Sequence, residues 1–185
     1  MNEHKFDVKK LDKLNNPERL NLIDIDEIIK ELDLPNESTI VDIGVGTGLF
    51  SEVFLNKLSN SKGFGFDISE EMVTWVNSNR EPALNGKLSA SVMSENKIPL
   101  ADNTADLVFM ITVHHELKNP GKLLEDVKRV LKNNGKLLIC DWKEGAHNHF
   151  VTKESIINDL MVSGFTNITE LNNSDKLICL ISNID

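Results

Sequence analysis

The sequence predicts a single α/β domain (residues 1–185) in which helices cover both faces of a mostly parallel β-sheet. The chain has 185 residues, 40% of them hydrophobic, which suits one hydrophobic core. From residue 39 onward, short apolar runs alternate with longer segments of helical periodicity, a pattern typical of a covered parallel sheet. Only the residues NNSD separate the last two predicted strands, so that pair should form an antiparallel hairpin.

The first predicted element is a helix from about residue 17 to residue 32. Leu20, Ile23 and Ile28 recur there at roughly helical spacing, and Pro17 suits a first helical turn. The residues DLPNES that follow are typical of a helix end.

Residues 1–35 as a whole are expected to form a helical cover over a ligand site, and residues 36–185 to form the α/β core. Phe6, Leu11 and Leu14 are the apolar side chains of this cover that would contact a ligand. An amphipathic helix that only packs against the sheet explains the same segment equally well, so both interpretations remain open.

The remaining elements follow in alternation. Strands are predicted at residues 39–43, 62–66, 88–92, 105–111 and 135–140, and then at 166–171 and 176–183. Helices are predicted at residues 48–58, 69–79, 120–132 and 153–165.

Charge narrows the range of partners. Lys and Arg total 20 against 29 for Asp and Glu, a formal net charge of −9 that would repel a phosphate backbone, so no nucleic-acid partner is expected.

The N-terminus MNEHKFDVKK lacks the apolar segment of a signal peptide, and no apolar run approaches the roughly 18 residues of a membrane-spanning helix. We therefore expect a cytoplasmic protein with no membrane association.

Three glycines follow the first strand of the core, in the run TIVDIGVGTGLF. At the end of a strand, Gly44 and Gly46 permit a tight turn and the close approach of a ligand to the backbone, and Gly48 lets the next helix pack on the sheet. Three glycines at alternate positions exceed what an ordinary strand-to-helix turn requires. The run therefore indicates a nucleotide-type ligand.

The surrounding residues restrict that ligand. A P-loop would need a Gly-Lys-Ser/Thr ending, and the dinucleotide motif G-x-G-x-x-G would place its third glycine one position later than Gly48. Asp42 lies two residues before the first glycine, and Asp67 ends the second strand, where a carboxylate can accept hydrogen bonds from both hydroxyls of a ribose. Two acids suit an adenosine joined to a cationic sulfonium better than an anionic pyrophosphate.

In order along the chain, VDIGVGTG, GFGFDIS, IPLADNTADLVFM and HHELKNPGKLLEDVKRVLKNNGKLLICDW resemble the motifs of class I S-adenosylmethionine-dependent methyltransferases, close to the type 11 branch. The resemblance extends from about residue 36 to the end of the chain. It implies a three-layer Rossmann-like methyltransferase fold whose seven strands have the order 3-2-1-4-5-7-6 with the last strand antiparallel. That arrangement agrees with the hairpin predicted above.

The resemblance also implies S-adenosyl-L-methionine as cofactor, S-adenosyl-L-homocysteine as its product, and a set of cofactor-binding positions. These are Asp42, Gly44, Val45, Gly46, Gly48, Asp67, Ile68, Met72, Ser94, Glu95 and Thr112. In this family the glycines surround the methionine and ribose, Asp67 would bind the ribose hydroxyls, and Ile68 and Met72 would pack on adenine. The adenine amino group would meet Ser94 or Glu95.

Four of the five histidines follow the predicted fourth and fifth strands, at positions 114, 115, 147 and 149, where Asp141 also lies. Three interpretations remain open for them. His114 and His115 could be structural, with a ring bonded to backbone. His115 could be a general base, because imidazole titrates in the useful range. The two histidine pairs could also ligate a divalent metal ion. Their spacing does not fix their mutual geometry, so this stays an alternative and no metal ligands are assigned.

Three functions compete on this evidence. The first is methyl transfer from S-adenosylmethionine to a small-molecule acceptor by in-line displacement. The second is a small nicotinamide-dependent oxidoreductase, which the glycine spacing and the absence of tyrosine from the chain disfavour. The third is a non-catalytic domain that binds S-adenosylmethionine or a protein partner, because the fold alone does not determine activity.

Overall fold

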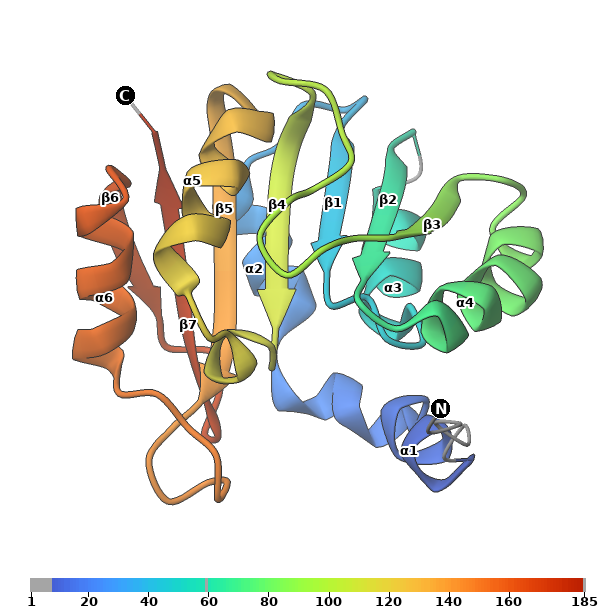
Figure 1. Cartoon of the computed structure of the whole chain (residues 1–185), viewed down its shortest axis with the longest axis horizontal. Helices are drawn as coiled ribbons and strands as arrows, with labels where there is room; N and C mark the ends of the chain where they lie inside the picture. Colours follow the sequence, from blue (N-terminus) through green and yellow to red (C-terminus); the bar gives the residue numbers. More distant parts are fainter. Residues whose placement is uncertain (1–7, 59, 185) are drawn as a thin grey trace.

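The computed structural model describes residues 8–58 and 60–184, and its centre is one seven-stranded sheet of order β3-β2-β1-β4-β5-β7-β6 (Figure 1). The strands are β1 (Thr39–Ile43), β2 (Lys62–Asp67), β3 (Leu88–Val92), β4 (Ala105–Ile111), β5 (Leu131–Trp142), β6 (Thr166–Leu171) and β7 (Leu177–Asn183). Strand β7 pairs antiparallel with both β5 and β6, and the other neighbours pair parallel. The predicted fold class, with its strand order and antiparallel last strand, is confirmed.

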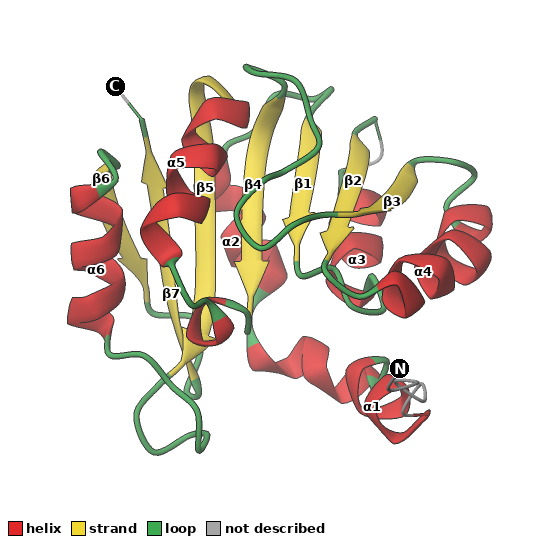
Figure 2. Ribbon diagram, viewed as in Figure 1, coloured by secondary structure: helices red, strands yellow, loops and turns green. Residues whose placement is uncertain are grey.

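Helices cover both faces of this sheet (Figure 2). The helices are α1 (Val8–Leu14), α2 (Ile25–Leu32), α3 (Leu49–Lys57), α4 (Glu70–Ala83), α5 (Pro120–Val130) and α6 (Lys153–Val162), with 3₁₀ turns η1 (Pro17–Leu22) and η2 (His114–Glu116). Helix α1 lies beyond the strand ends and covers neither face (Figure 2). Side chains alternate across a strand, so Ile40 packs in the core shared with α2, α3 and α4, while Val41 packs in the core shared with α5 and α6. Because both faces are buried, β1 reads as a nearly continuous apolar run.

The prediction of one helix over residues 17–32 is wrong, because the segment forms two shorter elements. The 3₁₀ turn η1 follows Asn16, whose side chain caps the amide of Glu18. Ile23 is then extended, with φ −142° and ψ 150°, and the side chain of Asp24 accepts a hydrogen bond from the amide of Glu27. The aspartate therefore acts as an N-cap and starts α2 anew.

Three other helix ends differ from the prediction. Helix α6 ends at Val162 rather than 165, and Gly164, with φ 82°, is no longer helical. Helix α4 continues to Ala83, four residues beyond the predicted end, and includes Pro82 in its last turn. Helix α5 ends at Val130 rather than 132, because Leu131 is extended and pairs with Ala105 at the start of β5. None of the helices within the described residues is long and apolar enough to cross a membrane.

The carboxyl ends of β1, β2 and β4 meet where the strand order changes direction, between β1 and β4. Ligands of open α/β sheets bind at such a point, because the chain leaves neighbouring strands toward opposite faces and opens a crevice. At the other end of the sheet, Arg129 in the last turn of α5 holds the segment that joins β3 to β4 by donating to the carbonyls of Leu100 (2.7 Å) and Ile98 (2.9 Å).

Candidate active site

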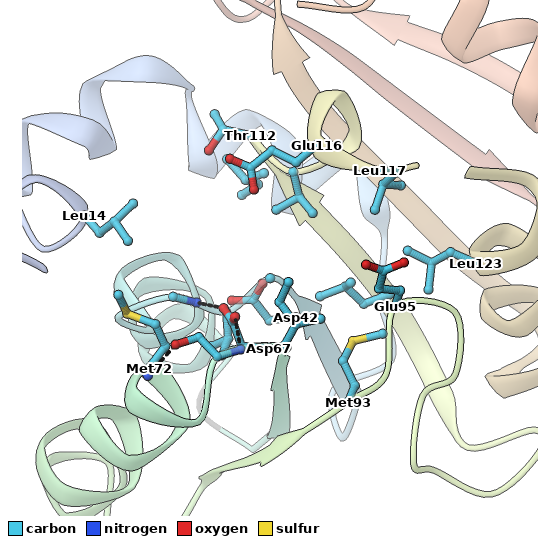
Figure 3. Close-up of a pocket in the computed structure, with 18 of the residues that line it drawn as sticks. Leu14, Asp42, Asp67, Met72, Met93, Glu95, Thr112, Glu116, Leu117 and Leu123 are labelled. Carbon is cyan, nitrogen blue, oxygen red and sulfur yellow. Dashed lines mark hydrogen bonds between the residues drawn. The ribbon is translucent and has the colours of Figure 1, made fainter. Parts of the chain in front are cut away.

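A cavity of about 370 Å³ lies at these strand ends (Figure 3). Its size is in the range of small-molecule sites. The glycine loop after β1, the end of β2, the segment after β3 and the turn after β4 all contribute to its lining. In the close-up, Asp67 and Met72 lie on one side, and Thr112 and Glu116 lie on the opposite side. Leu14, from the N-terminal segment, closes a third side.

The glycine loop and Asp67 form one hydrogen-bonded unit. Gly44 and Gly46 both have positive φ, 71° and 50°, which glycine adopts without strain. The amide of Gly46 donates to Oδ2 of Asp67 at 2.9 Å, and the amide of Ser69 donates to Oδ1 at 2.9 Å. A carboxylate oxygen has two lone pairs, so Asp67 keeps acceptor capacity for a ligand in the cavity.

Gly44 has no room for a side chain. A Cβ at this position would lie 2.5 Å from Cγ2 of Val113, in a backbone conformation that disfavours alanine. We expect Gly44→Ala to lower the free energy of unfolding by about 2 kcal/mol, which corresponds to a fall of roughly 4–8 °C in Tm for a domain of this size. Gly121→Ala on α5 is the control, because the nearest atom to its Cβ would be 4.0 Å away. Equal thermal unfolding of the two variants would contradict this account.

Asp42 is a buried carboxyl that lines the cavity and accepts a hydrogen bond of 2.6 Å from the hydroxyl of Ser51. Burial raises the pKa of Asp42 to about 8, in spite of the opposing effects of Ser51 and Arg19, and Asp67 adds to the rise. The folded protein without ligand therefore holds Asp42 protonated at neutral pH.

This raised pKa has a defined consequence for stability. The unfolded chain releases the proton of Asp42 near pH 4, and the folded chain releases it near pH 8. The contribution of Asp42 to the free energy of unfolding is therefore full below pH 4 and is lost as the pH rises to 8. We expect Asp42→Asn, which cannot ionise, to match the wild type near pH 4 and to become the more stable protein toward pH 8. Denaturant unfolding at several pH values measures this difference. A constant difference across the range would contradict it.

Arg19, on η1, brings a positive charge to the cavity from the N-terminal segment. Its guanidinium donates to the carbonyl of Leu14 and to Oγ1 of Thr112, both at 3.0 Å, and lies over the ring of Phe50. Burial lowers the pKa of Arg19 below its ordinary value, and the nearby carboxyl of Asp42 opposes part of this effect.

Thr112, the partner of Arg19, has a strained backbone. Its φ is 59°, which is unfavourable for a β-branched residue, and its amide donates to the carbonyl of Cys140.

His115 and Asp141 form a pair at the ends of β4 and β5. Nδ1 of His115 lies 2.7 Å from Oδ1 of Asp141, and the backbone amide of His115 donates to Oδ2 of the same carboxylate at 3.0 Å. Asp141 is fully buried and also accepts from the amide of Trp142. A carboxylate at Nδ1 favours the tautomer whose Nε2 is free to accept a proton. Nε2 lies 3.9 Å from Oε1 of Glu116, which lines the cavity.

The other three histidines of this region have different surroundings. His114 is buried, with Nε2 3.1 Å from Oδ2 of Asp159, and its Nδ1 has no hydrogen-bond partner within the described chain. His147 stacks on Trp142 with ring centroids 4.9 Å apart, and His149 is exposed in the same loop. Across residues 8–58 and 60–184, no three His, Cys, Asp or Glu side chains are arranged to hold a metal ion.

The structure brings most of the predicted cofactor positions together around one cavity. Those that line it are Asp42, Gly44, Val45, Gly46, Asp67, Ile68, Met72, Glu95 and Thr112. Three predicted site residues are not in its lining: Gly48 caps α3, Ser94 forms a bridge with Lys97, and His115 lies behind Glu116. Phe6 lies outside the described residues.

The sequence analysis did not identify Arg19, which lines the cavity. Arg19 stands in a segment with no glycine or strand signal, and nothing in the sequence distinguished it from other surface cations. Glu116 also lines the cavity. It stands in the HHEL run after the fourth strand, among the polar residues expected near the acceptor, but the sequence analysis gave it no role of its own.

Comparisons with known proteins agree with this geometry. The family model described as a methyltransferase domain matches residues 41–139, which span the glycine loop, Asp67 and the turn after β4. A solved S-adenosylmethionine-dependent methyltransferase from Aquifex aeolicus is 31% identical and superposes with a TM-score of 0.84, over 98% of this chain and 100% of the other.

Two curated relatives are named as O-methyltransferases. A malonyl-[acyl-carrier protein] O-methyltransferase of Methylococcus capsulatus is 27% identical over 72% of this chain and 54% of its own length. A mitochondrial ubiquinone biosynthesis O-methyltransferase of Candida albicans is 29% identical over 80% of this chain and 42% of its own length. The chain thus spans about half the length of these relatives. With the matched motifs, cavity and strand order, it belongs to the methyltransferase domain family, in the type 11 branch of class I S-adenosylmethionine-dependent methyltransferases.

Proposed function

We propose that this protein transfers the methyl group of S-adenosylmethionine to a small-molecule acceptor, with His115 as general base and Asp141 as the residue that orients it. The observation that carries the proposal is the Asp141–His115 pair, with its 2.7 Å contact and with Nε2 of His115 3.9 Å from Glu116 in the cavity lining.

The residues of the cavity fit the cofactor that the family implies. Asp67 retains acceptor capacity for two ribose hydroxyls, and Ile68, 66% exposed although apolar, offers a surface for adenine. Arg19 is a partly buried cation that none of the described carboxylates hydrogen-bonds, which suits the carboxylate of a methionine moiety. The bound cofactor would supply a methyl group already activated by its sulfonium sulfur. The protein's task is then to align the acceptor and exclude water.

We further propose that the N-terminal segment covers the cofactor. The carbonyl of Leu14 accepts hydrogen bonds from Arg19 (3.0 Å) and from the hydroxyl of Thr47 (3.2 Å), so this segment is attached to the glycine loop. Arg80 adds a second attachment by donating to the carbonyl of Thr47 and to Asn15. These contacts favour a cover over a helix that only packs on the sheet.

Calorimetric titration with S-adenosylmethionine, S-adenosylhomocysteine and NAD tests the proposal first. We expect both adenosyl compounds to bind and NAD not to bind. Methyl transfer to members of an acceptor library, followed as release of S-adenosylhomocysteine, is the second stage. Binding of NAD alone would support the oxidoreductase alternative, and cofactor binding without transfer to any acceptor would support the binding-only alternative.

A further inference from the structure

The charged residues of the cavity differ in how fully they are engaged. Asp67 accepts two backbone amides, and the carboxylate of Glu95 is paired with Lys118 at 2.5 Å. Arg19 is held by Leu14 and Thr112. The carboxylate of Glu116 makes no hydrogen bond with any described residue. Its Oε1 lies 3.9 Å from Nε2 of His115, which is too far for a hydrogen bond. Glu116 is therefore the charge available to a second ligand.

The position of Glu116 assigns it to the acceptor side. It lies across the cavity from Asp67 and Met72, the residues expected to hold the ribose and adenine (Figure 3). The turn η2 also carries His115, and Oε1 of Glu116 lies 3.9 Å from Nε2 of that histidine. Glu116 lines the cavity and His115 does not, so an acceptor in the cavity would meet this carboxylate beside the proposed base.

The three common kinds of acceptor respond differently to such a site. A carboxylate acceptor would meet the like charge of Glu116. A hydroxyl acceptor would become an anion on losing its proton, beside Glu116 and near the buried Asp141. An ammonium ion is attracted by Glu116, and it becomes neutral when it loses a proton. Only the amine forms its nucleophile without adding a charge to the site, because the positive charge passes from the ammonium to His115 while a hydroxyl would create a new anion and a new cation.

We infer that the methyl acceptor is a small primary or secondary amine, which enters as an ammonium ion and is bound by the carboxylate of Glu116. This inference rests on the proposed function. The ammonium gives one proton to His115 by way of Glu116, and the lone pair left on nitrogen forms the new nitrogen–carbon bond. The methyl–sulfur bond breaks and sulfur keeps its electron pair. The methylated nitrogen is again cationic, and His115 releases the proton to solvent.

The test combines transfer and binding. Pools of small amines, of alcohols and phenols, and of carboxylates are each offered with S-adenosylmethionine, and S-adenosylhomocysteine release is measured. The best amine is then titrated by calorimetry into the protein loaded with S-adenosylhomocysteine. Variants are Glu116→Gln, Glu116→Lys and the control Glu125→Gln, which removes one exposed negative charge on α5. Because Glu116 and Glu125 are both exposed, all three variants should keep the wild-type Tm.

We expect transfer to the amine pool, amine affinity about tenfold weaker in Glu116→Gln, none detectable in Glu116→Lys, and a change below about twofold in Glu125→Gln. Transfer confined to alcohols, phenols or carboxylates, or unchanged amine affinity in Glu116→Gln, would overturn the inference, while the observed methyl transfer would leave the proposed function standing. Transfer to no pool, or failure of both adenosyl compounds to bind, would contradict the proposed function and the amine inference together.

Discussion

Asp67→Ala is expected to weaken the binding of S-adenosylmethionine and S-adenosylhomocysteine at least a hundredfold. The carboxylate would accept hydrogen bonds from two ribose hydroxyls, and each charge-assisted bond contributes about 1.5–3 kcal/mol. The substitution also removes the acceptor of the Gly46 amide, so the glycine loop loses the contact that fixes it beside the ligand. Isothermal titration calorimetry with both compounds measures the loss.

Two controls separate ligand contact from loop disorder. Asp67→Asn keeps one carbonyl oxygen for the amide of Gly46 and should bind with intermediate affinity. Asp175→Ala, in the loop between β6 and β7, removes an acid that does not line the cavity and should leave affinity unchanged. Wild-type affinity in Asp67→Ala would contradict the assignment of Asp67 to the ribose.

Loss of His115 is expected to have the largest effect on turnover. General base catalysis contributes about 10²–10⁴ to a rate, so His115→Ala should lower kcat by a factor in that range while S-adenosylmethionine affinity stays near that of the wild type. His115 is not part of the cavity lining, which is why cofactor affinity should survive.

Asp141→Asn tests whether His115 acts through its orientation. The amide can accept one of the bonds from the backbone, but it no longer presents a carboxylate to Nδ1 of His115. We expect a large fall in kcat with unchanged cofactor binding, because the imidazole loses its preferred tautomer. His149→Ala serves as control, since His149 is exposed and its ring lies beside His147 rather than His115. If His149→Ala reduced kcat as much as His115→Ala, the role of His115 as base would be contradicted.

The sequence by itself determined the α/β fold class, the glycine loop and the place of Asp67 from local rules, whereas the strand order and the other expected cofactor positions were implied by the resemblance to a known family. Strand and helix periodicities are set by neighbours a few residues apart, and the glycines of the loop can be recognised because positive φ excludes most other residues at Gly44 and Gly46. Asp67 could be placed because it ends a strand next to the glycine loop in the sheet. The break at Ile23 was missed, because the apolar pattern continues through an N-cap that only side-chain geometry shows.

Only the tertiary structure decided which polar side chains meet. Arg19 reaches Thr112 across 93 positions of sequence, and Asp141 reaches His115 across 26, through two parallel strands whose ends adjoin. It also showed that Glu116, rather than His115, faces the cavity. Sequence spacing fixes the direction of a side chain only within one helix or strand. Contacts between elements depend on how those elements pack, so the charged residues that line the cavity could be identified only from the folded chain.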